Sequence, residues 1–421
     1  MKNPYFHALL ADKKPLKPNQ AIPETIIELA YTWFGRPNWA YSASANKYWV
    51  GGVVAGRQNV VEYDIATGKY TPTKTGTEYE NDDHNQVQLL IRDSDKRLLA
   101  VYAGHNSDYI GIRISTNPLD GKSWQSENNI NIPYLKSYPS PYQASNGNIF
   151  IFFRAREYVT PQINLWQYIK SIDGGVTWGS AVTIYDTGED FTPYLISCQD
   201  GNVIHFCATP GNPDEDSGLD TYHFSFDMIT ETAKNSAGTT ITLPATVSNM
   251  TLVEAVGSNE NSWILDIITK NGIPRILYAY FPQGSPFEPN EGKQRLLKYA
   301  EWNGTNWITS IICQTAYKYL GSEINVDQHY YTGVARFCQN NPDLIFVPIA
   351  FEPLKPLELF KYDLRNGGLE QLTFNSPFEH DNWRPISIPC NQNNLLWMYN
   401  LDYTDFTNYK IQLKAMTVNT D

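Results

Sequence analysis

Short apolar runs recur along the whole chain and are separated by turns rich in glycine, asparagine and aspartate. Clear examples lie at residues 48–54, 86–92, 98–104, 149–154, 165–171, 203–208, 275–281, 344–351 and 395–400. Runs of this length, bounded by turn residues, are typical of β-strands. We find no convincing amphipathic helix of 12 or more residues, although residues 23–30 could form a short one. Since no linker or low-complexity tract divides the chain, the pattern predicts one all-β domain over residues 1–421, with residues 1–30 as an N-terminal extension leading into its first part.

The composition supports this interpretation and excludes several classes of protein. Aromatic residues make up 14% of the 421 residues, with 28 tyrosines, while charged residues make up only 18%. Aromatic side chains suit pleated, half-buried surfaces, and this much apolar material excludes a disordered chain. The net charge of −12 argues against nucleic acid as a partner, because such binding depends on neutralising phosphates. The five cysteines are scattered and form no disulfide framework.

One turn motif indicates a repeated architecture. Residues 171–178 read S-I-D-G-G-V-T-W and fit the Asp-box pattern S-x-D-x-G-x-T-W, with weaker echoes at 115–124 and 301–307. The tryptophans at 124 and 178 are 54 residues apart, and 178 to 307 is 129 residues, or about two such steps. A four-stranded propeller blade takes roughly 40–50 residues or more. The sequence therefore predicts a single β-propeller, most simply of seven blades with four antiparallel strands each.

Two histidines mark a first hairpin that could carry chemistry. The strand at 86–92 begins just after His84, and the strand at 98–104 ends just before His105. If Arg92 pairs with Arg97 across the turn, His84 and His105 lie directly opposite each other, about 5 Å apart. A single histidine is more often an ordinary core or surface residue, but two in this cross-strand position make a functional role the stronger hypothesis.

A second hairpin brings a tyrosine and an arginine together. A three-residue loop near residues 145–147 places Tyr138 opposite Arg154, whereas a two-residue loop would send the two side chains to opposite faces. The prolines at 139 and 141 leave both registers open. Taken alone, such a pair is more often part of the packing than of a site.

These residues together resemble a known family. The stretches Asp-Asp-His-Asn at 82–85 and Gly-His-Asn at 104–106, followed by Tyr138 and Arg154, are similar to the ulvan lyase families. The likeness includes Tyr-Thr-Trp-Phe at 31–34 and extends over most of the chain at low similarity. The resemblance implies a seven-bladed propeller with Asp-boxes that cleaves a uronic-acid polysaccharide by β-elimination.

The resemblance also implies roles for individual residues. Arg154 would pair with the uronate carboxylate, Tyr138 would protonate the leaving oxygen, His84 or Tyr138 would remove the C5 proton, and His105 would orient the substrate. Arginine fits its role because a guanidinium stays charged at any working pH and reduces the charge that develops beside the carboxylate. Further substrate contacts are expected from Asn85, Asn106, Tyr142, Arg156, Tyr222 and Arg384.

The sequence departs from the family pattern at residues 209–214. A stretch of Thr-Asp-Gly-His-Pro-Arg type is replaced here by Thr-Pro-Gly-Asn-Pro-Asp, which lacks both the histidine and the second arginine. Asp214 would repel a carboxylate or sulfate. Ulvan and another uronate-containing polymer, such as a bacterial capsule or exopolysaccharide, therefore both remain candidate substrates.

A metal site is a further expectation. His205 and Cys207 alternate onto the same face of one strand, and His223 is near in sequence. The resemblance implies a structural divalent ion, calcium or zinc, and this donor set would suit zinc. The alternative is that these are ordinary buried strand residues. No organic cofactor is expected, since phosphate-binding glycine loops are absent.

Two other functions stay open. A sialidase-type hydrolase would need three arginines around one carboxylate, and only Arg36 is a candidate for the first of them. A glycan-binding propeller without activity is the non-enzymatic alternative. In each case the partner is a glycan, and we expect a monomer. The sequence contains no run of 18 apolar residues, so it predicts no membrane insertion. We expect an extracellular protein, although the start of the chain shows no signal peptide.

Overall fold

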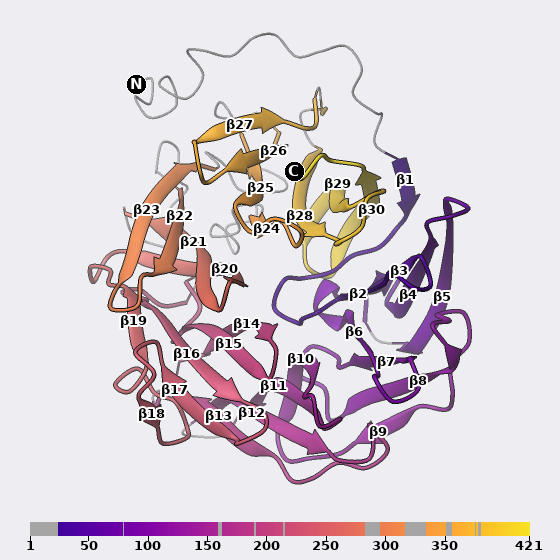
Figure 1. Cartoon of the computed structure of the whole chain (residues 1–421), viewed down its shortest axis with the longest axis horizontal. Coiled ribbons are helices and arrows are strands. Elements are labelled where there is room, and N and C mark those ends of the chain that lie inside the picture. The colour runs from indigo at the N-terminus through magenta and orange to yellow at the C-terminus, as the bar shows by residue number, and fades with distance from the viewer. Residues whose placement is uncertain are drawn as a thin grey trace.

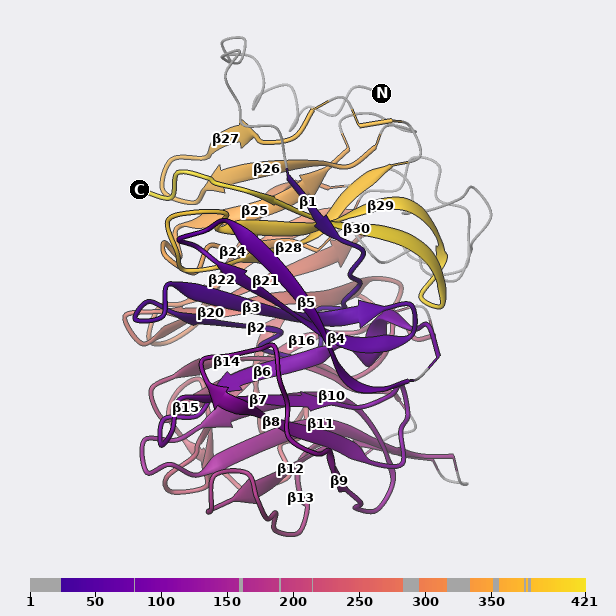
Figure 2. The same ribbon diagram turned by 90° about the vertical axis from the view of Figure 1, so that its right-hand side faces the viewer.

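Seven antiparallel sheets form a ring in the computed structural model (Figure 1). The structure describes residues 24–78, 80–158, 162–188, 191–213, 215–282, 295–315, 334–350, 356–374, 376–377 and 380–421. Within these residues the only helical element is the 3-10 turn η1 (Asp83–Asn85). The prediction of an all-β, seven-bladed propeller is confirmed, and Figure 2 shows its sheets from the side.

The blades follow one another along the chain. The first blade contains β2 (Trp39–Ser42), β3 (Lys47–Val54), β4 (Arg57–Asp64) and β5 (Lys69–Glu78). The second contains β6 (Val87–Ile91), β7 (Arg97–Tyr102), β8 (Ile110–Pro118) and β9 (Asn128–Ile130). The third contains β10 (Leu135–Gln143), β11 (Ile149–Glu157), β12 (Ile163–Ser171) and β13 (Val182–Asp186). The fourth has six strands: β14 (Tyr194–Asp200), β15 (Val203–Thr209), β16 (Thr221–Asp227), β17 (Thr232–Asn235), β18 (Thr240–Ile241) and β19 (Thr251–Glu254). The fifth blade contains β20 (Asn261–Lys270), β21 (Ile273–Phe281), β22 (Leu296–Trp302) and β23 (Trp307–Gln314). The sixth contains β24 (Arg336–Phe337), β25 (Leu344–Ile349), β26 (Glu358–Asp363) and β27 (Gly368–Gln371).

The seventh blade joins the two ends of the described chain. It contains β28 (Asp381–Ser387), β29 (Leu395–Asp405) and β30 (Asn408–Met416), and its outer strand is β1 (Glu24–Ile27). β1 pairs with β30 in antiparallel register, with Thr25 opposite Lys414. Residues 24–27 of the expected N-terminal extension are therefore part of the propeller, while residues 1–23 lie outside the described residues.

The segment after β1 loops in toward the middle of the ring (Figure 1), and Arg36 of this segment belongs to a buried ion cluster. Arg36 from this segment and Arg336 from the sixth blade both bond to Asp266 of β20, and Arg336 does so over 3.2 Å. The second oxygen of Asp266 accepts the backbone N–H of Phe337 at 2.7 Å. Because a buried charge without a partner is strongly destabilising, this cluster fixes the first segment to the fifth and sixth blades. Arg36 is thus held by an aspartate, and the sialidase-type role considered for it has no support in its contacts.

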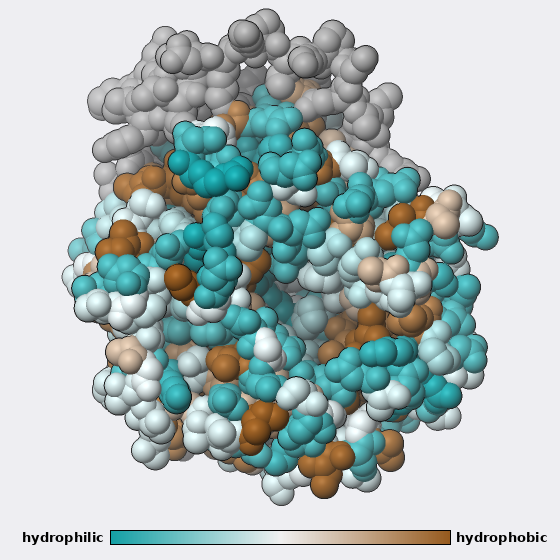
Figure 3. All heavy atoms as spheres, viewed as in Figure 1, coloured by the Kyte–Doolittle hydropathy of each residue, from teal (hydrophilic) through white to brown (hydrophobic). Residues whose placement is uncertain are grey.

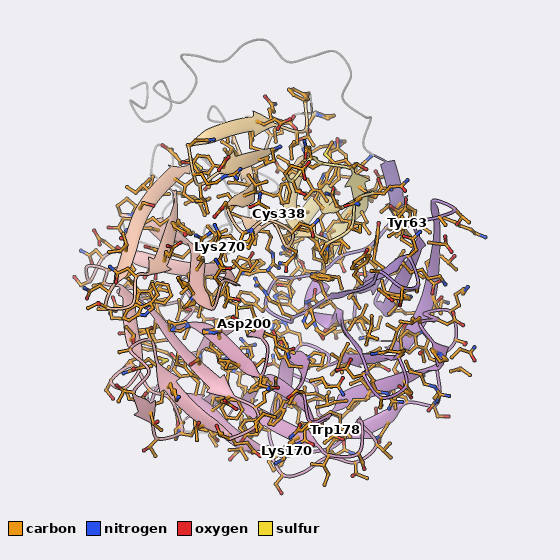
Figure 4. The ribbon with its side chains drawn as sticks, viewed as in Figure 1. Tyr63, Lys170, Trp178, Asp200, Lys270 and Cys338 are labelled. Carbon is orange, nitrogen blue, oxygen red and sulfur yellow. The ribbon has the colours of Figure 1, made fainter. Side chains whose placement is uncertain are left out.

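The turn at residues 171–178 lies between β12 and β13, the third and fourth strands of its blade. Ser171 Oγ accepts the N–H of Gly175 at 2.8 Å, and Asp173 accepts that of Thr177 at 2.9 Å. Figure 4 labels Trp178 and Lys170 beside each other at the rim of this blade, where the Lys170 carbonyl accepts the N–H of Gly179 at 2.9 Å. The motif therefore stabilises a rim turn, away from the chemistry described below.

The face seen in Figure 3 is mostly hydrophilic, with apolar residues in small separate groups. Within the part of the chain that the structure describes, no helix has the length and apolar character needed to cross a membrane.

Candidate active site

His84 and His105 stack on each other at the open end of the β6–β7 hairpin. The register pairs Val87 with Tyr102 and Ile91 with Leu98, which is the register that places the two histidines opposite each other. Their ring centroids are 4.4 Å apart and their planes differ by 10°. The predicted juxtaposition is confirmed. Locally, His84 lies in η1, where the Asp82 side chain caps the turn by accepting the N–H of His84 at 2.8 Å.

One carboxylate connects the two imidazoles. Asp82 Oδ1 lies 2.6 Å from Nδ1 of His84, and Asp82 Oδ2 lies 3.1 Å from Nδ1 of His105. The pKa of Asp82 is lowered, because the charge of His84 and the hydrogen bonds from both rings outweigh burial. An ionised carboxylate only accepts hydrogen bonds, so the Nδ1 atom of each ring carries a proton. The Nε2 atom of a neutral ring is then left with a free lone pair.

The two histidines have pKa values shifted in opposite directions. Burial alone would lower the pKa of His84, but the Asp82 and Asp83 carboxylates raise it to about 9. In His105, burial and then the positive charge of His84 outweigh the attraction of Asp82 and lower the pKa to about 4. At neutral pH the pair therefore carries a single positive charge, with His84 cationic and His105 neutral.

Tyr138 lies beside this pair because β10 bulges at that point. The far part of the β10–β11 hairpin has the register predicted from a three-residue loop, with Gln143 opposite Ile149. A bulge between Ser137 and Ser140 then brings Ser137, instead of Tyr138, opposite Arg154. Tyr138 takes a φ of 56° there, a conformation uncommon for a bulky residue. Its ring centroid is 5.6 Å from that of His84 and 6.0 Å from that of His105.

Arg154 reaches over the Tyr138 ring and is almost completely buried. Its Cζ lies 4.6 Å from the Tyr138 ring centroid and 5.0 Å from that of Tyr194, and the residue is 1% exposed. Its Nε and Nη1 atoms have no hydrogen-bond partner in the described structure. Burial raises the pKa of Tyr138 well above its usual value even though Arg154 acts to lower it. The result is a protonated phenol next to a guanidinium with unused donors.

The walls of the site are aromatic residues that lie far from the histidines in the sequence. Phe406, in the β29–β30 turn, packs edge-on against His84 and His105 with centroids 5.2 and 5.7 Å away. Tyr194 at the start of β14 lies 6.1 Å from Tyr138. These aromatic residues, together with the bridging role of Asp82, are what the sequence analysis missed. Only Asp82 had a signal in the sequence, since an aspartate two residues before a histidine is a typical turn cap.

The predicted asparagines and Arg156 lie around the site. Asn85 Oδ1 accepts the N–H of His105 at 2.7 Å, so this residue shapes the histidine pair. Asn106 Nδ2 donates to the hydroxyl of Tyr158 at 3.3 Å. Arg156 lies two residues beyond Arg154 on β11, with its Cζ 4.4 Å from the Tyr158 ring centroid.

The structure does not bring the other three predicted contacts to this point. Tyr142 is buried and its hydroxyl lies 2.8 Å from Ser197 Oγ. Tyr222 lies on β16 of the fourth blade, where its hydroxyl donates to the Asp220 side chain at 3.0 Å. Arg384 is 1% exposed and pairs with Asp83 behind the histidines, 2.5 Å away, so it supports η1 from inside the protein.

The predicted metal set is not assembled as three ligands. His205 Nδ1 lies 3.2 Å from His223 Nε2, but the buried Cys207 does not complete a group of three. In the described residues, the one group of three whose ligand atoms all lie within 4.8 Å is Asp82, His84 and His105. This spacing allows a divalent ion.

The orientation of that group fits a metal poorly. Ring lone pairs lie in the ring plane, and two planes only 10° apart at 4.4 Å run side by side without converging on one ion. The Nδ1 atoms are also already bonded to Asp82. The group is built as a hydrogen-bonded pair around a carboxylate.

The stretch that departs from the family pattern is described only in part. Thr209 is buried at the end of β15 and its hydroxyl lies 3.5 Å from the carbonyl of Gly211. Asp214, expected to repel an anionic substrate, lies outside the described residues.

Several solved structures share this fold. An ulvan lyase of polysaccharide lyase family 25, bound to a glucuronate–rhamnose-3-sulfate saccharide, has a TM-score of 0.70 at 16% identity, with 95% of this chain and 96% of that chain covered. An oligogalacturonate lyase in complex with manganese has a TM-score of 0.52 at 12% identity, covering 95% and 96%. An α-L-arabinofuranosidase from Fusarium graminearum reaches 0.50 at 11% identity, covering 95% and 98%.

Sequence comparisons give a family but no close relative. No curated protein sequence matches the chain. Residues 40–314, from the first blade through the fifth, match the sequence model of the BNR repeat-containing family. The chain therefore belongs to the BNR repeat-containing family of proteins, in its β-propeller form.

Proposed function

We propose that this protein is a polysaccharide lyase that cleaves a uronic-acid-containing glycan by β-elimination at the site of His84, His105, Tyr138 and Arg154. The observation that carries the proposal is Arg154, a buried guanidinium with two donor atoms unused, 4.6 Å from the ring of a protonated tyrosine. A carboxylate is the ligand that a guanidinium binds best, through charge-assisted hydrogen bonds. The fold shared with several polysaccharide lyases supports the same reaction class.

Arg154 would make the first step feasible. Removing the C5 proton of a uronate places new negative charge beside an existing carboxylate. A guanidinium that binds the carboxylate in a water-poor site stabilises this charge as it develops. Because Arg154 is fixed between the Tyr138 and Tyr194 rings, it needs little reorganisation to do so.

The histidine pair and Tyr138 would divide the proton transfers. We assign the base to Nε2 of His105, since Asp82 engages its Nδ1 and its lowered pKa keeps the ring neutral. The base takes the C5 proton, and the electron pair of the broken C5–H bond forms the C4–C5 double bond. The bond from C4 to the glycosidic oxygen breaks, and the Tyr138 hydroxyl supplies the proton for that oxygen. The raised pKa of Tyr138 keeps this proton available.

His84 has a different role in this scheme. Its pKa of about 9 leaves it protonated, stacked against His105, so it keeps His105 neutral and adds positive charge beside the substrate. That charge compensates in part for the second arginine missing from residues 209–214. Ulvan and other glucuronate polymers are therefore both reasonable first substrates.

The decisive experiment follows ultraviolet absorbance during incubation with ulvan, its desulfated form and other uronic-acid polymers. Wild-type protein should give a rising absorbance, because β-elimination creates a conjugated 4,5-double bond. Tyr138→Phe and His105→Ala should each lower the rate by roughly 10²–10⁴-fold. The matched control is Arg365→Ala, which removes an exposed arginine paired with Asp363 far from the site.

Each alternative function gives a different result. New reducing ends without absorbance would indicate a hydrolase and would contradict the lyase assignment. Retention on the polymers without any cleavage, unchanged by Tyr138→Phe and His105→Ala, would indicate a glycan-binding protein.

A further inference from the structure

We propose that a cavity beside the active site binds a second, uncharged sugar unit of the polysaccharide, adjacent to the uronate that is cleaved. The inference rests on the proposed function and extends it. The cavity has a volume of about 430 Å³ and its lining includes Tyr134, Lys136, Arg156 and Tyr158. It is separate from the four residues assigned to catalysis.

The cavity adjoins the site along one strand. Arg154 and Arg156 are two residues apart on β11, so their side chains leave the same face about 7 Å from each other. This distance is comparable to the length of one pyranose unit. On the other side, the Tyr158 hydroxyl accepts a hydrogen bond from Asn106, the residue after His105. A glycan with its uronate at Arg154 would therefore place a neighbouring unit in the cavity.

Lys136 fixes the walls of the cavity before any ligand arrives. Its ammonium group donates to the carbonyl of Asp108 at 2.6 Å and to the carbonyl of Ile132. The Lys136 backbone also pairs with Ser107 through two hydrogen bonds of 2.7 and 2.9 Å. The connections before β8 and before β10 are thus held to each other. A cavity with fixed walls loses little entropy when it binds a ligand.

The lining suits a sugar with an apolar face. Tyr158 is 56% exposed, and Ile132, Leu135 and Tyr134 add apolar surface. Arg156 lies over the Tyr158 ring, with its Cζ 4.4 Å from the ring centroid, at the edge of this apolar surface. Aromatic rings bind the apolar face of a pyranose, and a charged group at the edge fixes its orientation.

The charges of the lining argue against an anionic unit. Lys136 and Arg156 are balanced by Asp108 and Glu157, so the formal charge is zero, and Lys136 is occupied by carbonyl groups. A sulfate or a second carboxylate would meet two carboxylates, and one of the two cations beside them already donates to two carbonyl groups. The cavity therefore distinguishes an uncharged unit from a charged one.

The test compares short and long substrates with Tyr158→Ala and Arg156→Ala. Both variants should lower kcat/KM on polymeric desulfated ulvan, whose units next to the uronate are uncharged, by about tenfold, the effect of one aromatic contact. Both should leave kcat/KM unchanged on the shortest oligosaccharide that ends at the cleaved uronate, because that substrate lacks the neighbouring unit on the side away from the broken bond. Desulfated ulvan should be used at least as well as ulvan, and Arg365→Ala should match wild type throughout.

A binding measurement separates this proposal from the proposed function. Tyr138→Phe protein should be retarded in gels containing desulfated ulvan, and adding Tyr158→Ala should weaken that retardation. Retardation that depends on Tyr158 would support the cavity even if wild type produced no unsaturated product. Equal losses on short and long substrates, no loss on either, or retardation unaffected by Tyr158→Ala would overturn it.

Discussion

The role proposed for Arg154 requires two properties that lysine cannot supply together: a positive charge and a planar pair of donors. Arg154→Lys keeps the charge in the buried site but loses the paired geometry. We expect kcat/KM to fall by about 10²-fold or more, with the loss mainly in kcat, since the contact strengthens as charge develops. Ultraviolet progress curves at several substrate concentrations check this. An unchanged kcat would contradict the role assigned to Arg154.

The opposed pKa shifts of the histidine pair predict a pH dependence of stability. The folded pKa of His84, about 9, lies above the usual 6.5, so its contribution is complete below pH 6.5 and is lost as pH rises toward 9. The folded pKa of His105, about 4, lies below 6.5, so the unfolded state binds the extra proton and stability falls as pH drops from 6.5 toward 4. The pair therefore contributes most near pH 6.5.

Urea denaturation across this pH range checks the prediction. Compared with wild type, His84→Gln should lose the decline above pH 6.5, and His105→Gln should lose the decline below it. If both variants parallel wild type at every pH, the two pKa values are not shifted in opposite directions.

Divalent ions should not be needed for cleavage. The rings of His84 and His105 run parallel and their Nδ1 atoms bond to Asp82, so a chelator removes nothing that these groups use. We expect EDTA treatment followed by dialysis to leave the rate of ultraviolet change within about twofold. A loss restored by zinc or manganese would require a metal at or near the site.

Much of this site could be predicted at the residue scale, but only where the residues involved are close together in the sequence. The His84–His105 pair followed from counting residues across one short turn, because hairpin register is set by the turn. The position of Tyr138 was only half predicted, since a bulge is decided by contacts between strands and leaves no clear pattern. Phe406 and Tyr194 had no signal, because only the closed ring brings them beside the histidines.

At the scale of elements, Glu62 connects the first two blades. Glu62, on β4, accepts hydrogen bonds from Trp49 Nε1 at 2.9 Å and from the N–H of Gly121 at 2.8 Å. The pKa of Glu62 is lowered because these bonds and Lys47 outweigh the effect of burial. Glu62→Gln keeps the shape but weakens the acceptor. We expect a loss of about 1–3 kcal/mol in the free energy of unfolding, measured in urea, with catalysis on ulvan unchanged.

The number and kind of blades were predicted from turn spacing, but two features of the sheets were not. The fourth blade has six strands instead of four, and its outer pieces β17 to β19 are too short to give a recognisable alternation. β1 has only four residues, and a strand that short shows no period of its own. Its partner is 389 residues away, so no local rule could find it.

At the scale of the whole molecule, closure by β1 should carry measurable stability. Deleting residues 1–27 removes the outer strand of the seventh blade and exposes the edge of β30, whereas deleting residues 1–23 leaves β1 in place. We expect the longer deletion to lower the melting temperature by about 5 °C or more relative to the shorter one, and to promote aggregation. Equal melting temperatures would show that the ring holds without this strand.

The pairing of β1 with β30 also orders events during synthesis. Thr25 leaves the ribosome long before Lys414, the residue whose ammonium group its hydroxyl contacts in the finished ring. β1 therefore has no partner until β30 has been synthesised, and the seventh blade can be completed only then. The nascent protein stays an open arc for almost the whole of translation. Because Phe406 comes from that final blade, the histidine pair gains its last wall, and the site its finished shape, only after the arc has closed.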